Sequence, residues 1–311
     1  MVIIGFSMAA CGGGGDDDDD GSGGSGGSLT WTAVDSTFNI PVNAIAWGND
    51  KFVAGGNSGV AYSTDGISWT AVTDSTFNNF SVSAIAWGNG KFVAGGSSSY
   101  GGDGKMAYSS DGITWTAVTD STFNNKEFRA IAWGNGKFVA GGSSSYYGGG
   151  IMAYSSDGIT WTAVTDSTFD SHILTIAYGN NKFVAGRYGG EIAYSSDGVT
   201  WTSLYNPTGS VIEIVWGKDK FVAVSTPGLL YSSDGVKWSV GNVPNGEAFL
   251  TIAWGNGKFV AGGYGKVAYS SNGITWTIEA NTIVPFSLSS IAYGNGKFVA
   301  GSINGMAYAS W

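Results

Sequence analysis

The chain has 311 residues, including 52 Gly, 13 Trp, 15 Tyr and 16 Phe, and only 12% of its residues are charged. Its formal charge is −9, of which Asp16–Asp20 supply five, so there is no basic excess of the kind that nucleic-acid binding requires. Glycine-punctuated aromatic and β-branched residues favour short strands and tight turns, and no apolar run reaches the roughly 18 residues of a membrane-spanning helix.

Residues 1–28 differ in composition from the rest of the chain. Residues 1–11 form a short apolar run with small residues directly before Cys11, the only cysteine. This run resembles the end of a bacterial lipoprotein signal peptide, which implies lipidation of Cys11 and anchoring in the cell envelope, either periplasmic or surface-exposed. The alternative is an incidental free thiol in a disordered leader. Residues 12–28 read as a disordered Gly/Ser/Asp tether with a root-mean-square span of roughly 20–25 Å.

A phrase close to AIAWGNGKFVAGG recurs through the remaining residues, 29–311. Its seven copies start at Ile45, Ile85, Ile131, Ile176, Ile214, Ile252 and Ile291. Successive copies are therefore 40, 46, 45, 38, 38 and 39 residues apart. A period near 40 built from short strands is typical of propeller blades rather than of a helical solenoid.

Each repeat predicts four strands. In the second repeat these are Ala84–Trp87, Lys91–Ala94, Met106–Ser109 and Ile113–Val118. Asn89-Gly90 joins the first two strands and Asp111-Gly112 joins the last two. Both dipeptides suit a type I′ turn, which needs positive φ at its two central residues. We therefore expect a hairpin at both places.

The last repeat predicts how the fold closes. Within Ser290–Trp311 it has only three expected strands, and Leu29–Val34, at the other end, repeats the sequence of a fourth strand. Pairing these two ends in one blade would close a ring of seven and leave no unpaired blade edge. We predict an all-β, seven-bladed propeller with four-stranded blades, formed by residues 29–311.

Ser109–Trp115 reads SSDGITW, and related copies carry Asp65, Asp157, Asp197 and Asp234, with Asn272 in the sixth repeat. The segment resembles the Asp-box, the S-x-D-x-G-x-T-W hairpin (BNR repeat) of sialidase-type propellers, although it lacks the residue between Asp and Gly. The resemblance implies a sialidase-like β-propeller. It implies no activity, because Asp-boxes in that family are structural hairpins remote from the catalytic centre.

Two aromatic positions recur in every repeat, and we expect both to pack between blades. One is occupied by Trp31, Trp69, Trp115, Trp161, Trp201, Trp238 and Trp276, and the other by Trp47, Trp87, Trp133, Tyr178, Trp216, Trp254 and Tyr293. Asp-Ser-Thr-Phe motifs place Phe38, Phe77, Phe123 and Phe169 in the links between blades, where we expect them to plug gaps.

The sequence lacks the residues of several enzyme classes. Sialidases hold the substrate carboxylate with three arginines, whereas this chain has two, Arg129 and Arg187. A single histidine, His172, provides neither a zinc cluster nor an evident Ser-His-Asp triad, and no nucleotide-binding motif is found. A glycosidase needs only two carboxylates, which could come from Asp103, Glu127, Glu191, Glu213 and Glu247. Nothing in the sequence pairs these acids, so we expect no enzyme activity, cofactor or metal.

The turns predict two different faces of the ring. We call the face with the Asn-Gly and Asp-Gly turns the hairpin face, and the face with the second-to-third-strand and blade-to-blade links the loop face. The hairpin face repeats almost without change and carries a ring of lysines at Lys51, Lys91, Lys137, Lys182, Lys220, Lys258 and Lys297. We expect neighbouring Asp-Gly aspartates to balance these lysines.

The loop face varies from blade to blade and therefore carries the candidate binding residues. Its longest insertions are Gly96–Lys105 and Gly142–Ile151, and the candidates are Tyr100, Asp103, Tyr146, Tyr147, Arg187, Tyr188 and Tyr264. Tyrosine-rich loops suit glycan or protein recognition, although Gly/Ser/Tyr loops can also be simple linkers. The sequence thus predicts a monomeric binding module for a glycan or protein. A glycoside hydrolase or lyase and a structural scaffold remain as alternatives.

Overall fold

The structure of the chain is a computed structural model that describes residues 29–34, 41–57, 59–78, 80–98, 104–119, 122, 126–144, 148–165, 169–204, 209–226, 228–279 and 287–310. Several sequence predictions lie outside this part of the chain. They are the signal segment with Cys11, the tether, Phe38, Tyr100, Asp103, Phe123, Tyr146 and Tyr147.

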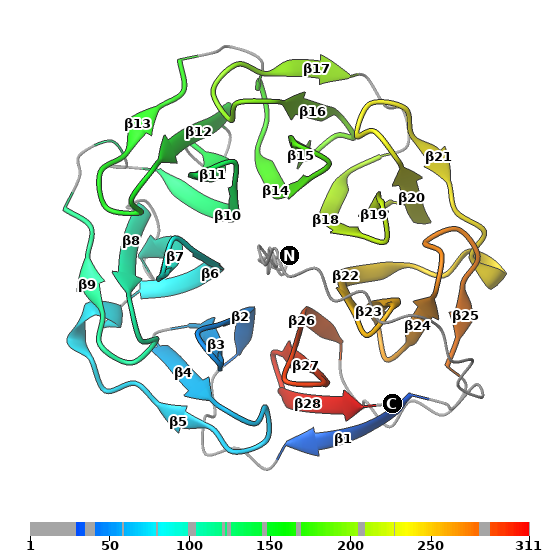
Figure 1. Ribbon diagram of the computed structural model, residues 1–311, viewed down its shortest axis with the longest axis horizontal. Helices are drawn as coiled ribbons and strands as arrows, with labels where there is room; N and C mark the ends of the chain where they lie inside the picture. Colours follow the sequence, from blue (N-terminus) through cyan, green and yellow to red (C-terminus); the bar gives the residue numbers. More distant parts are fainter. Residues whose placement is uncertain are drawn as a thin grey trace.

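The described residues form seven four-stranded antiparallel sheets arranged as the blades of a propeller (Figure 1). Blades 1 and 2 contain β2 (Val42–Gly48), β3 (Lys51–Gly56), β4 (Gly59–Ser63), β5 (Thr70–Ala71), β6 (Phe80–Gly88), β7 (Lys91–Ser98), β8 (Gly104–Ser109) and β9 (Thr116–Ala117). Blades 3 and 4 contain β10 (Glu127–Gly134), β11 (Lys137–Ser143), β12 (Gly150–Ser155), β13 (Thr162–Ala163), β14 (Ile173–Gly179), β15 (Lys182–Arg187), β16 (Ile192–Ser195) and β17 (Thr202–Leu204).

Blades 5 and 6 contain β18 (Val211–Gly217), β19 (Lys220–Ser225), β20 (Gly228–Ser232), β21 (Ser239–Val240), β22 (Phe249–Gly255), β23 (Lys258–Gly263), β24 (Val267–Ser270) and β25 (Thr277–Ile278). Short 3-10 turns at Ser75–Phe77 and Pro244–Gly246 lie in two of the links between blades. No helix in the described part of the chain is long and apolar enough to cross a membrane.

Blade 7 closes the ring as predicted. It contains β26 (Leu288–Gly294), β27 (Lys297–Ser302) and β28 (Gly305–Ser310), and its fourth strand is β1 (Thr30–Val34) from the other end of the domain. β1 pairs antiparallel with β28, from Thr30 opposite Ser310 to Val34 opposite Met306. The prediction of a seven-bladed propeller closed by the N-terminal strand is confirmed.

The two predicted hairpins have different outcomes. Asn89 and Gly90 have φ of 46° and 69°, so both central residues are left-handed, as a type I′ turn requires. β8 and β9 do form an antiparallel hairpin, but the type I′ turn predicted at Asp111-Gly112 is wrong, because only Gly112 is left-handed, with φ of 75°. β8 ends at Ser109 and β9 begins at Thr116, so residues 110–115 form a wider loop instead of the start of the fourth strand.

The recurring phrase AIAWG explains how neighbouring blades pack. Side chains along a strand alternate between its two faces, so each first strand presents its small residues to the following blade and its large ones to the preceding blade. A Cβ added to Gly48 in blade 1 would lie 2.2 Å from Cγ of Trp87 in blade 2. Equivalent glycine–aromatic contacts link each of the remaining pairs of neighbouring blades, including Gly294 of blade 7 with Trp47 of blade 1. The prediction that the aromatic residues equivalent to Trp47 pack between neighbouring blades is confirmed.

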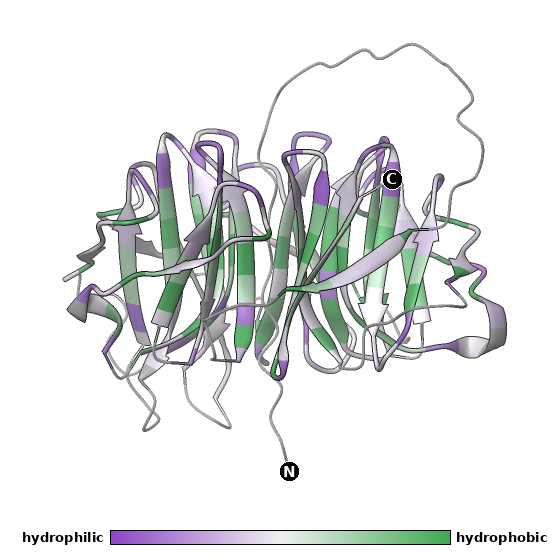
Figure 2. Ribbon diagram, turned by 90° about the horizontal axis from the view of Figure 1, so that it is seen from below, coloured by the Kyte–Doolittle hydropathy of each residue, from purple (hydrophilic) through white to green (hydrophobic). Residues whose placement is uncertain are grey.

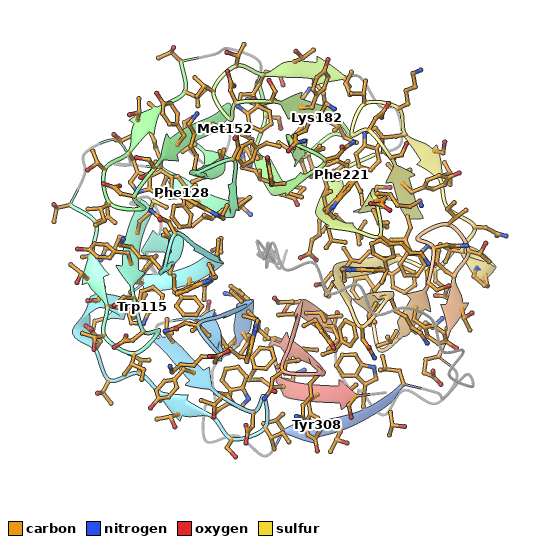
Figure 3. The ribbon with its side chains drawn as sticks, viewed as in Figure 1. Trp115, Phe128, Met152, Lys182, Phe221 and Tyr308 are labelled. Atoms are coloured by element: carbon orange, nitrogen blue, oxygen red, sulfur yellow. The ribbon has the colours of Figure 1, made fainter. Side chains whose placement is uncertain are left out.

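The hydrophobic core is divided among the spaces between blades. Residues from two neighbouring blades form one cluster that includes Val53 of blade 1 and Phe80, Phe92 and Trp115 of blade 2. Trp115, Phe128 and Phe221 are among the side chains that fill the body of the ring (Figure 3). Phe77 is buried and packs edge-on against Trp115 with ring centroids 5.1 Å apart, so this link does plug the gap between blades 1 and 2.

Candidate functional site

The strand connections separate the two faces of the disc. The turns from first to second strand and the loops from third to fourth strand lie on the hairpin face, and the other links lie on the loop face. Seen edge-on in Figure 2, apolar residues occupy the middle of the strands and hydrophilic residues gather toward the two faces. A ligand approaching either face therefore meets connecting loops rather than core.

Three large apolar side chains project from equivalent positions on the loop face. Tyr188, Tyr264 and Ile303 lie between the second and third strands of blades 4, 6 and 7, and they are 65%, 60% and 60% exposed. Tyr188 and Tyr264 were predicted from the sequence, whereas Ile303 was missed because it stands in a short turn without aromatic neighbours. Tyr100, Tyr146 and Tyr147 come from the same connection in blades 2 and 3, outside the described residues.

Backbone contacts hold both described tyrosines in place. The Tyr188 N–H donates to the carbonyl of His172, with a separation of 3.0 Å between nitrogen and oxygen. Tyr264 forms an isolated antiparallel bridge with Ser287. The main chain is thus fixed to the neighbouring link while the ring points to solvent, and such preorganised aromatic groups lose little conformational entropy on binding.

Arg187, the third described candidate, forms ion pairs with Asp170 and Glu191. Its side chain is only 16% exposed, whereas Asp170 is 80% exposed. Two carboxylates surround one guanidinium, so this corner carries no unbalanced positive charge for an anionic ligand. Asp170 precedes Arg187 by 17 residues and lies in a different link, which is why sequence spacing did not indicate the pairing.

The acids that could serve a hydrolase are mostly occupied elsewhere. Glu127 pairs with Arg129 at 3.0 Å, and Glu247 pairs with Lys266. These two pairs and the Arg187 pairs all lie on the loop face. Within the same residues there is no cluster of three or more His, Cys, Asp or Glu side chains that could hold a metal.

Glu213 differs from the other acids because it is buried within β18, at 3% exposure, rather than near a loop as expected. Its Oε2 accepts the N–H of Ile252 in the next blade at 2.7 Å. Burial raises the pKa of Glu213 well above its usual value, and this hydrogen bond only partly opposes the rise. Thr175 and Ser290 hold the equivalent positions of blades 4 and 7 and accept the same type of bond, from Ile214 and Ile45. Glu213 therefore joins two blades.

On the hairpin face, each Asp-box is satisfied by its own backbone. Asp111 Oδ1 accepts the N–H groups of Ile113 and Thr114 at 2.8 Å, and Ser109 Oγ accepts that of Gly112 at 2.8 Å. Partial burial opposes ionisation of Asp111, but these N–H donors outweigh it, so its pKa lies below the usual value. The pKa values of Asp65, Asp157, Asp197 and Asp234 are lowered in the same arrangement.

Two lysines of the ring on this face make contacts within the propeller, one of which reaches the next blade. Lys137 Nζ donates to the backbone carbonyl of Asp197 at 3.0 Å, and it lies 5.7 Å from the ring centre of Tyr154. Lys258 Nζ likewise lies over the ring of Tyr269, 5.4 Å from its centre. The expected pairing with Asp-box carboxylates is not seen among the described residues, where Lys137 contacts the carbonyl instead. These contacts favour a structural role for the hairpin face and leave the loop face as the candidate site.

The fold is shared with solved structures of different function. A structure of YCF48 bound to D1 peptide has a TM-score of 0.69 and 14% identity, over 91% of this chain and 95% of that one. Virginiamycin B lyase from Staphylococcus aureus has a TM-score of 0.74 and 11% identity, over 91% and 99%. The WD40 propeller domain of Doa1 has a TM-score of 0.64 and 13% identity, over 91% and 96%.

No protein-family model matches the chain, and no curated protein matches it either. At these identities the structural likeness establishes the class of fold, a β-propeller. That class contains both binding proteins and a lyase, so function has to be argued from the site.

Proposed function

We propose that the chain is a non-catalytic binding module, anchored in a bacterial cell envelope, that recognises a glycan or a protein through its loop face. The observation that carries this proposal is the repeated exposure of Tyr188, Tyr264 and Ile303 at one structural position. Large apolar side chains are normally buried in a stable ring, and their alignment on one face is typical of a recognition surface.

The chemistry of the face favours an uncharged ligand surface. The described ion pairs neutralise one another within the loop face, which leaves aromatic rings and backbone groups as the available contacts. Tyrosine packs against apolar sugar faces or peptide side chains and also donates a hydrogen bond. Tyr100, Tyr146 and Tyr147 would enlarge this surface, with Asp103 as an acceptor.

The geometry of β1 agrees with an anchor on the opposite side. Thr30 pairs with Ser310, which ends the third strand of blade 7, so β1 begins at the hairpin face. A tether attached before Leu29 would therefore join the hairpin face, and a lipid on Cys11 would leave the loop face directed away from the membrane. This arrangement suits a monomer that displays its binding surface outward.

Similar structures support binding and also supply an alternative. YCF48 was solved with a bound peptide, which supports a protein ligand for the same fold. The lyase keeps catalysis as an alternative, but Glu127, Glu191 and Glu247 are ion-paired and Glu213 is buried in a strand. Without a free carboxylate pair among these acids, binding is the better-supported function.

The test is binding of the full chain carrying Cys11→Ser, which prevents lipidation, to a glycan array and to envelope proteins. Two loop-face variants accompany it, Tyr188→Ala/Tyr264→Ala/Ile303→Ser and Tyr100→Ala/Tyr146→Ala/Tyr147→Ala. The matched control is Ile67→Ser/Ile113→Ser, which changes exposed apolar side chains of the hairpin face. We expect at least one of the loop-face variants to abolish binding and the control variant to retain it. Binding lost only in the control would contradict the proposal, and cleavage of a bound glycan would establish the enzyme instead.

A further inference from the structure

The hairpin face contains a set of clamps between neighbouring blades. In each clamp the side-chain amide of the asparagine in a first turn donates to a backbone carbonyl at the Asp-box of the next blade. The five clamps run from Asn49 to Ser110, Asn89 to Ser156, Asn135 to Ser196, Asn180 to Ser233 and Asn295 to Thr64, at 3.1–3.2 Å between nitrogen and oxygen.

Asn256 has the same turn without the clamp. Its surroundings, Trp-Gly-Asn-Gly-Lys-Phe, are identical to those of Asn89 and Asn135, and φ is 46° at all three residues. Among the described residues, however, no acceptor lies within hydrogen-bonding distance of the Asn256 amide. The reason lies in the closure of the ring, because blade 7 takes its fourth strand from β1 and no Asp-box loop joins β28 to it.

We propose that Asn256-Gly257 is a site of spontaneous modification, and that it deamidates fastest among the four Asn-Gly turns that join a first strand to a second strand. The backbone nitrogen of Gly257 attacks Cγ of Asn256. A nitrogen–carbon bond forms, the bond from Cγ to the amide nitrogen breaks, and ammonia leaves with the proton from Gly257. Water then opens the cyclic imide at one of its two carbonyl carbons, which yields aspartate or isoaspartate.

The clamp controls the first of these steps. To react, the asparagine side chain must rotate until its Cγ lies against the nitrogen of the following glycine, and a clamped amide must first break its bond to the next blade. The backbone does not distinguish the four turns, since φ is 45° or 46° at each asparagine and a Cβ on any of the four glycines would meet nothing within 4 Å. The side-chain hydrogen bond is thus the difference that remains.

The products would alter the edge between blades 6 and 7. Aspartate adds a negative charge two residues from Lys258. Isoaspartate inserts an extra methylene into the main chain of the turn between β22 and β23, and a type I′ turn of two residues has no room to absorb it. Among these four turns, the one beside the closure of the ring is therefore expected to deamidate first.

Peptide mapping of the intact, folded chain tests the proposal. The protein is incubated in mildly alkaline buffer, digested at intervals, and analysed by mass spectrometry with fragmentation that locates the modified residue and identifies isoaspartate. The peptides with Asn89, Asn135 and Asn295 are internal controls. We expect deamidation of Asn256 to be several-fold faster than that of each control.

A parallel incubation in denaturant isolates the effect of the fold. Unfolding removes the clamps, so the four turns should then react at nearly equal rates. Equal rates in the folded protein, or a faster reaction at one of the clamped turns, would overturn the proposal. So would an excess at Asn256 that persists in denaturant, because local sequence rather than the missing clamp would then be the cause.

Discussion

The hairpin face and the loop face of this propeller solve different problems. On the hairpin face the same residues recur from blade to blade, and their polar groups bond within the Asp-box or to the adjacent blade. On the loop face the connections differ in length and chemistry, charges pair locally, and Tyr188, Tyr264 and Ile303 remain exposed. The comparison indicates that stability is concentrated on one face, which leaves the other free to vary.

The largest effect is expected for alanine at a glycine that contacts an aromatic side chain of the next blade. Gly88→Ala, at the hairpin end of β6, places a Cβ 2.2 Å from Cγ of Trp133 in the next blade. Overpacking of this kind should cost about 3 kcal/mol of unfolding free energy. Gly228→Ala, at the loop-face end of β20, meets nothing within 4 Å and is the matched control. Urea denaturation measures both, and equal costs would show that the contact between Gly88 and Trp133 does not limit the packing of neighbouring blades.

Loss of an Asp-box acceptor should have the next largest effect. Asp111→Ala leaves the N–H groups of Ile113 and Thr114 without their carboxylate and should cost about 1–2 kcal/mol. Asp111→Asn should cost much less, because Asn272 accepts the same two bonds in blade 6. Thermal unfolding of the two variants checks this order, and an asparagine as damaging as alanine would show that charge rather than hydrogen bonding matters.

The Asp-boxes also predict the acid limit of stability. Because the pKa of Asp111 is lower in the folded chain than the ordinary 3.8, the folded state holds fewer protons than the unfolded state in this range. Stability should therefore be fully present above about pH 3.8 and decline as the pH falls through the lower folded value. Replacing Asp65, Asp111, Asp157, Asp197 and Asp234 by Asn should flatten this decline. If the stability of the variant declines as steeply with falling pH as that of the parent chain, groups other than these aspartates cause the decline.

Glu213→Gln should stabilise the protein at neutral pH. Burial raises the folded pKa of Glu213 above 4.5, so stability is lost as the pH rises from that value through the folded pKa. Glutamine keeps an acceptor for Ile252 and carries no charge. We expect the Tm to rise by about 2 °C near pH 7, with the difference vanishing near pH 4. A lower Tm at neutral pH would mean that the ionised carboxylate stabilises the interface.

The repeated residues predicted the fold far better than they predicted the site. The period of the recurring phrase and the split last repeat indicated seven blades and their closure, because both are visible as repeated residues along the chain. The Asp-Gly loop was misjudged, since the carboxylate of Asp111 binds two backbone N–H groups and holds the loop open beyond two residues. Contacts such as Arg187 with Asp170, or Glu213 with Ile252, join different links or blades and leave no spacing signal.

The smallest expected effect on stability tests the central claim most directly. We would measure the Tm of Tyr188→Ala/Tyr264→Ala/Ile303→Ser beside that of Asp65→Ala/Asp111→Ala/Asp157→Ala. Exposed residues that serve binding rather than packing should each contribute within about 0.5 kcal/mol, so the loop-face triple variant should melt close to the parent chain while the Asp-box triple variant melts several degrees lower. If the loop-face variant loses as much Tm as the Asp-box variant, those side chains support the ring, and the division between the two faces does not hold.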